Sequence, residues 1–140
     1  MNTKLLLATL VGTITAFLLG WLVFGMLLDP YYQANMVQVK GLYRGEADFK
    51  LYGVFLSNFC QCLLLAYVFD KWANIRTLGT GFAGGLIIAG LSTAGFDIMQ
   101  WSQMNFAPYK MYAVDILVSA VFGGVVGSVI AVVLGRWKTV

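Results

Sequence analysis

Histidine is absent from this chain of 140 residues, and cysteine occurs only twice. Without histidine there is no imidazole to bind haem or zinc, and no base for a Ser-His-Asp triad. Cys60 and Cys62 are two residues apart, so on a helix their side chains diverge by about 200° and are not expected to form a disulfide. We interpret both as small buried residues. Two thiols alone make no metal site, and we predict no metal and no other cofactor.

Charged residues are also scarce. They make up 11% of the chain, about half the share in a soluble domain, whereas hydrophobic residues make up 60%. This composition excludes a water-soluble protein and indicates an integral membrane protein, whose first partner is the lipid bilayer. The net charge of +3 implies no nucleic-acid partner, because Lys and Arg gather at the ends of membrane spans.

Four long apolar segments account for this composition. A helix needs about 20 mainly apolar residues to cross a bilayer. The sequence therefore predicts an all-α fold, in which residues 1–140 form one integral-membrane domain with a bundle of four transmembrane helices. The predicted spans are residues 5–28, 51–69, 79–101 and 116–135. We do not expect the first span to be a cleaved signal peptide, because it is too long and no small-x-small cleavage site follows it.

The longest connection, residues 30–50, carries Tyr32, Met36, Val39 and Tyr43 at spacings of 4, 3 and 4. This spacing is typical of one face of a helix. Two interpretations stay open, namely a short helix on the membrane surface and an ordered loop anchored by interfacial tyrosines. The other two connections are short, so spans 2 and 3, and likewise spans 3 and 4, are expected to be antiparallel neighbours.

The basic residues predict the orientation, because Lys and Arg favour the cytoplasmic side of a membrane. Five of them lie on the side of the two termini and four lie on the other side. This margin predicts that both termini are cytoplasmic. The first group is Lys4, Lys71, Arg76, Arg136 and Lys138, and the second is Lys40, Arg44, Lys50 and Lys110.

Small residues recur at every fourth position of the predicted spans and therefore share one face of each helix. Because lipid provides no hydrophobic force between helices, such faces promote close backbone packing instead. The pattern predicts helix packing, either within one four-helix bundle or, for span 4, in a homodimer. The glycines that carry this prediction are Gly12, Gly20, Gly81, Gly85, Gly123 and Gly127.

Polar residues interrupt spans 2 and 3, and their two polar faces are expected to meet. Polar groups in hydrocarbon must find partners, so one interpretation is a set of interhelical hydrogen bonds. The other is a polar pocket or a proton path, because ionisable residues inside a membrane span are candidates for function. The candidate pocket residues are Asn58, Gln61, Thr93, Asp97, Gln100 and Asp115.

The carboxylates of this group lie near the predicted outer side of the membrane. Asp97 precedes a tryptophan by four residues, about 6 Å of helix rise, so it should be shallow if that tryptophan is an interfacial anchor. Asp115 and Asp29 fall on the same side. The three form either a ring that attracts a cation or a basic partner, with Lys110 and Arg44 as the nearest counter-ions, or three solvated helix-end residues. Asp115 is also placed to act as the N-cap of span 4.

Three stretches carry a resemblance to known proteins, namely AFLLGWLVFGMLLDPYY (16–32), LLLAYVFDKWANIRT (63–77) and GGLIIAGLSTAGFDIMQW (84–101). They resemble a group of small four-span bacterial membrane proteins of unknown function. The resemblance implies a location in the bacterial cytoplasmic (inner) membrane and supports the four-helix topology. It implies no activity and no site residue.

Three functional hypotheses follow. The first is a non-enzymatic packing or accessory subunit that associates with itself or joins a larger membrane complex. The second is a small transporter or ligand-binding membrane protein with a polar pocket near the outer face. The third, an intramembrane enzyme that uses the carboxylates, has the least support, because the sequence offers no base or nucleophile in a suitable setting.

Overall fold

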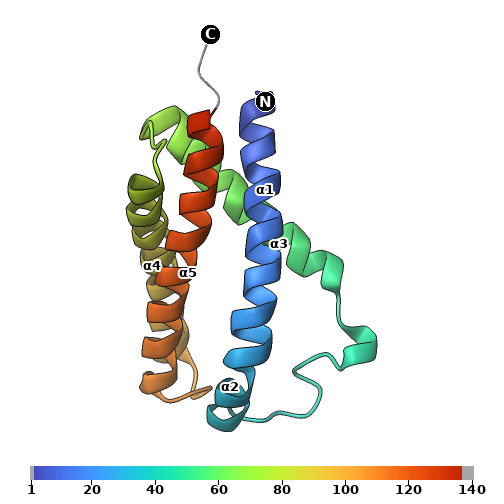
Figure 1. The fold of residues 1–140 in the computed structure, drawn as a ribbon. Coiled ribbons are helices and arrows are strands. Elements are labelled where there is room, and N and C mark those ends of the chain that lie inside the picture. Colours follow the sequence, from blue (N-terminus) through green and yellow to red (C-terminus); the bar gives the residue numbers. More distant parts are fainter. Residues whose placement is uncertain (1, 137–140) are drawn as a thin grey trace.

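The computed structural model describes residues 2–136, and within this range the chain forms helices and loops but no strand (Figure 1). The first helix, α1 (Thr3–Gly20), continues into a π-helical segment (Trp21–Leu27) and is followed by the short α2 (Asp29–Asn35). A 3-10 turn (Glu46–Asp48) precedes α3 (Leu51–Tyr67), which continues into a second π-helical segment (Val68–Trp72). The last two helices are α4 (Leu78–Gln103) and α5 (Tyr109–Arg136).

Four helical segments are long and apolar enough to cross a membrane, which confirms the predicted architecture at this coarse level. The largest difference from the predicted spans is at α5, which begins at Tyr109 rather than at residue 116. The extra turns are stable because they bury Met111 and Tyr112. Asp115 therefore lies inside the helix, and its predicted role as an N-cap is wrong.

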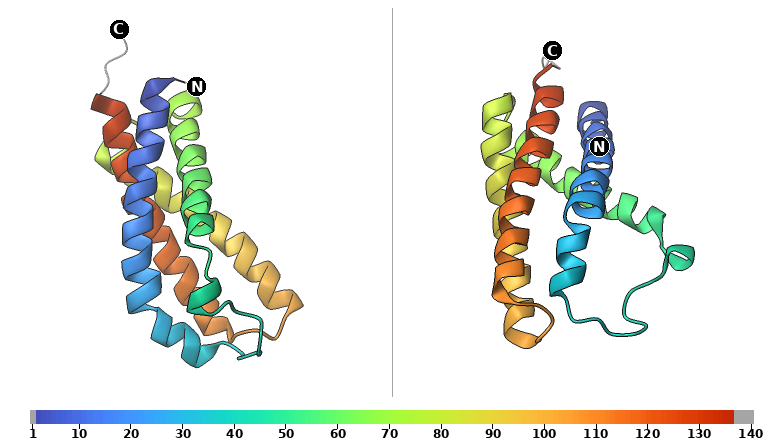
Figure 2. Two further views of the ribbon diagram at one scale, coloured as in Figure 1. Left: turned by 90° about the vertical axis from the view of Figure 1, so that its right-hand side faces the viewer. Right: turned by 60° about the horizontal axis from the view of Figure 1, so that its bottom comes forward.

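Helix α5 packs against both α4 and α1. α4 lies along α5, whereas α1 lies between α5 and α3. Figures 1 and 2 show that α3 crosses the bundle at an angle and diverges from α4 with distance from their connection. The expectation that spans 2 and 3 pack as neighbours is therefore wrong, because a short connection fixes only the helix ends that it joins. Within that connection, Asn74 adopts a positive φ of 48° and redirects the chain.

Glycines let α4 and α5 approach each other closely. A Cβ placed on Gly127 would lie 2.9 Å from the Cα of Gly85, and one on Gly85 would lie 3.1 Å from the Cα of Gly127. Gly81 and Gly123 contact backbone across the same interface. The small-residue faces of α4 and α5 are thus used within the chain, which leaves no free glycine face on α5 for a homodimer of the predicted kind.

The other two predicted packing glycines lie on α1. A Cβ on Gly12 would lie 2.6 Å from Cγ1 of Ile130, and one on Gly20 would lie 3.6 Å from the ring of Phe122. Both glycines therefore face α5, and there they meet side chains of α5 rather than its backbone. Between α1, α3 and α5 lies the main apolar core, which includes Leu5, Ala8, Leu65, Phe69, Ile130 and Leu134.

Helix α1 begins and α5 ends at the same end of the bundle, which we call the Asp70 end (Figure 1). The Asp70 carboxylate is 6% exposed and faces three cations: Lys4 at 3.2 Å, Lys71 at 3.4 Å and Arg76 at 2.7 Å. These residues come from α1, from the π-helical segment after α3, and from the connection to α4. The ion cluster therefore holds together the segments that meet at this end.

The connection after α2 is an ordered loop rather than a continuous surface helix. The helix ends at Asn35, so the predicted helical face reaches only as far as the first of its four residues. The β-branched Val37 and Val39, and Gly41 at a φ of 83°, oppose its continuation. The loop is held in place where the Val37 amide donates to the Phe106 carbonyl at 2.8 Å.

Candidate functional site

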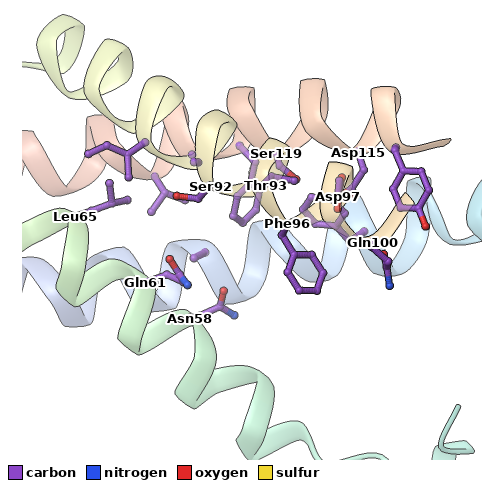
Figure 3. Close-up of a pocket in the computed structure, with 18 of the residues that line it drawn as sticks. Asn58, Gln61, Leu65, Ser92, Thr93, Phe96, Asp97, Gln100, Asp115 and Ser119 are labelled. Atoms are coloured by element: carbon purple, nitrogen blue, oxygen red, sulfur yellow. The ribbon is translucent and has the colours of Figure 1, made fainter. Parts of the chain in front are cut away.

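A cavity of about 650 Å³ lies between α1, α3, α4 and α5, toward the end opposite Asp70. We call this the Asp97 end. Polar side chains of α3 and of α4 line the cavity (Figure 3). All six candidate pocket residues border it, namely Asn58 and Gln61 of α3, Thr93, Asp97 and Gln100 of α4, and Asp115 of α5.

The cavity exists because α3 diverges from α4. Within residues 2–136, no hydrogen bond joins Asn58 or Gln61 to the polar side chains of α4. The expectation that these two polar faces pack directly is therefore wrong. They lie on opposite sides of a space that can hold a small molecule.

Asp97 and Asp115 form the most charged part of the lining, with their carboxyl groups as neighbours (Figure 3). Asp97 is only 5% exposed, and its Oδ2 atom is buried without a hydrogen-bond partner among residues 2–136. The hydroxyl of Tyr112, another residue of the lining, is buried and unpartnered as well. A native protein rarely leaves such atoms unsatisfied unless a water, an ion or a ligand completes the site.

Tyr32 of α2 closes this acidic pair from one side, and its hydroxyl donates a hydrogen bond to Asp115. Burial, and then the hydrogen bond to Asp115, raise the pKa of Tyr32 above its usual value, so the hydroxyl stays protonated as a donor. Pro30 starts α2 with a φ suited to a helix. Asp29, also in the first turn of α2, is exposed and does not line the cavity, so the predicted ring of three carboxylates is wrong.

The expected counter-ions are not at the site. In the part of the chain that the structure describes, every ion pair involves Asp70, and both Lys110 and Arg44 are exposed. Lys110 stands five residues before Asp115 on the same helix, which turns it away by about 140°. Arg44 lies in the loop after α2. The carboxyl pair therefore has no cation of its own among the described residues.

A further feature of the cavity is the set of side chains that can bind metal ions. Among residues 2–136, no group of three or more His, Cys, Asp or Glu side chains comes together. The cavity brings together two protein carboxylates, whereas Ca²⁺ takes about six to eight oxygen ligands. The two cysteines are free: Cys62 is buried and borders the cavity, whereas Cys60 is exposed, contrary to the expectation that both are buried.

Aromatic side chains form much of the remaining wall. Phe24 and Phe122 stack edge to face with ring centroids 5.4 Å apart, and Phe96 lies beside Asp97 in the lining. Apolar walls with a few polar groups that fix orientation are the usual arrangement of a small-molecule site, and 650 Å³ falls within the usual range of such pockets.

Sequence reasoning missed several residues of the lining, above all Tyr32, Tyr112, Ser92 and Ser119. Ser119 and Tyr112 stand four residues after and three residues before Asp115, so helical spacing was a usable signal. Tyr32 gives no comparable signal, because its contact with Asp115 joins positions 83 residues apart.

No protein-family model, curated protein or solved structure matches the chain. The resemblance to small four-span bacterial membrane proteins stays a prediction. Function must accordingly be argued from the chemistry of the cavity itself.

Proposed function

We propose that this chain is a multi-pass membrane protein that binds a small organic molecule in the cavity at the Asp97 end, as a binding protein or a small transporter. One observation carries the proposal: the cavity is bordered by the buried, unpartnered Oδ2 of Asp97 and hydroxyl of Tyr112. An unsatisfied buried polar group costs about 1–3 kcal/mol. A ligand that bonds to these atoms recovers that free energy on binding.

This function accounts for more of the molecule than a packing or accessory subunit does. The strongest small-residue faces, those of α4 and α5, pack on each other within the chain. A purely structural subunit gives no reason for a cavity of about 650 Å³ beside a buried carboxyl pair. Self-association or a larger membrane complex stays a prediction that the binding role neither needs nor excludes.

Location and orientation belong to the same proposal. We place the protein in a bacterial inner membrane with both termini in the cytoplasm. The supporting observation is that Lys4, Lys71 and Arg76 gather around Asp70 at the end of the bundle where α1 begins and α5 ends. The cavity then lies toward the outer face. Of the basic residues counted for this side, Lys138 lies outside the described residues.

The proposal is tested by ligand binding to the full chain in lipid nanodiscs. A panel of small cationic, neutral and anionic compounds is screened by thermal shift, and each hit is measured in two variants of α4. Gln100→Leu removes a polar side chain from the cavity, whereas Gln103→Leu makes the same change at an exposed position outside it.

We expect Gln100→Leu to weaken binding about three- to tenfold, the effect of one lost hydrogen bond, or to change which compounds bind. Gln103→Leu should bind as the wild type does. Hits whose affinity is the same in both variants and also in Tyr112→Phe, or the lack of any hit in the whole panel, would contradict the proposal.

A further inference from the structure

The carboxyl groups of Asp97 and Asp115 are neighbours, and no Lys or Arg among residues 2–136 pairs with them. Two ionised carboxylates side by side in a partly buried site repel each other strongly, so one of them normally holds a proton. Tyr32 donates to Asp115 and leaves Asp97 without a donor on Oδ2.

The other elements around the cavity supply no positive charge. Within the part of the chain that the structure describes, its lining includes no Lys or Arg, and its α1 residue, Ala16, is apolar. Besides the two aspartates, the titratable groups nearby are neutral in their protonated form. They are Tyr32 of α2, Cys62 of α3, Tyr112 of α5 and, next to Tyr112, Tyr43 of the loop.

The walls favour one class of ligand for such a pair. An ammonium group has three hydrogen-bond donors and no acceptor, which matches the two carboxyl groups and the hydroxyl of Thr93 or Ser119. The rings of Phe24, Phe96 and Phe122 suit an apolar body and attract a nearby cation. A bare metal ion has no apolar body to fill the space between these rings.

We infer that the ligand is a small organic amine in its protonated form, and that it binds in exchange for a proton that Asp97 and Asp115 share in the empty site. The inference rests on the proposed function and names its ligand class. Charge balances: the ammonium enters, the shared proton leaves to water, and the net charge of the site is the same before and after. No covalent bond of the ligand changes.

The test uses the full chain in nanodiscs with a matched pair of probes, benzylammonium and the neutral benzyl alcohol. Calorimetry in two buffers of different ionisation enthalpy gives the affinity and the number of protons released. We expect the amine to bind at least about tenfold more tightly than the alcohol, the difference that one buried charge pair makes. We also expect release of about one proton per amine, with affinity rising up to about tenfold per pH unit while the pair holds its proton.

Asp97→Asn and Asp115→Asn leave a single carboxylate, so each should abolish proton release and weaken amine binding. Asp48→Asn makes the same change at an exposed position outside the cavity and should have no effect. Infrared spectroscopy of the wild type needs no variant to fold: the carbonyl band of a protonated carboxyl group should be present without ligand and should disappear when benzylammonium is added.

The outcomes separate this inference from the proposed function. Equal binding of amine and alcohol without proton release would overturn the exchange and leave the binding pocket standing. The exchange would also be overturned, and the pocket would still stand, if neither probe binds but neutral or anionic compounds of the larger panel do. Their binding would then have to be weakened by Gln100→Leu. If no compound of any charge binds, both the inference and the proposed function fail.

Discussion

The two ends of the bundle each contain an aspartate whose side chain is largely buried, but the two aspartates have opposite surroundings. Asp70 faces three cations at 2.7–3.4 Å, which tie together the segments that meet there. Asp97 faces another aspartate, a tyrosine hydroxyl bound to that aspartate, and a cavity. The comparison teaches that burial of a charged residue does not identify a site. What distinguishes the Asp97 end is a buried carboxyl group that has no ion-pair partner within residues 2–136.

The largest difference between the two ends should be in stability. Asp70→Asn leaves Lys4 and Arg76 without their anion, and we expect the free energy of unfolding to fall by about 3–5 kcal/mol, as when a buried ion pair loses one partner. Asp97→Asn removes a buried carboxyl group that must share a proton with Asp115 in the folded protein, so it should leave stability unchanged or raise it. Unfolding of both variants in lipid nanodiscs or mixed micelles checks this, and an equal loss in both would break the comparison.

The second prediction concerns the close packing of α4 on α5, two helices that extend from one end of the bundle to the other. Gly85→Ala places a methyl group against the backbone of Gly123 and then of Gly127, and it should cost about 1–3 kcal/mol through overpacking. Gly95→Ala, on the same helix, meets nothing within 4 Å and should be neutral or slightly stabilising. Thermal unfolding of the two variants measures the difference. Equal stability would show that α4 and α5 are not held this closely.

A smaller effect is expected from the contact that joins α2 to the acidic pair. Tyr32→Phe removes the donor to Asp115 and should lower stability by about 1 kcal/mol, with faster hydrogen exchange in α2. Tyr31→Phe is the matched control, because no hydrogen bond of the Tyr31 hydroxyl is found within residues 2–136 and Tyr31 does not line the cavity. If the amides of α2 exchange at the same rate in both variants, the hydrogen bond from Tyr32 to Asp115 does not hold α2 in place.

The same contact gives the smallest predicted effect, a pH dependence of defined sign. Folding raises the pKa of Tyr32, mainly by burial, so the folded state favours the protonated phenol. Its contribution to stability is fully present below the unfolded pKa of about 10 and is lost as the pH rises through the higher folded pKa. Stability measured against pH should therefore fall less steeply above about pH 10 in Tyr32→Phe than in the wild type.

The sequence predicted those parts of the fold that depend on local pattern. Long apolar runs gave the four helices, and four-residue spacing put Gly81 and Gly85 on the face of α4 that contacts α5. The tilt of α3 is not encoded locally, because it results from packing against α1 and α5 rather than from the length of the connection to α4. The space between α3 and α4 was unpredictable for the same reason.

The candidate site shows the same division. Helical spacing grouped Thr93, Asp97 and Gln100 on one face of α4, and all three border the cavity. Spacing gave no means of knowing that Asn58 would lie across a gap from them rather than in contact. Nor did it indicate that Tyr32 would approach Asp115 in place of Asp29, because α2 ends after two turns and docks by a long-range contact.

The most direct test of the contrast between the two ends is the infrared spectrum of the protein without ligand, recorded for the wild type, Asp97→Asn and Asp70→Asn. The account predicts a protonated carboxyl band in the wild type that is lost in Asp97→Asn and retained in Asp70→Asn. A wild type without this band, or a band that disappears with Asp70 instead of Asp97, would contradict it.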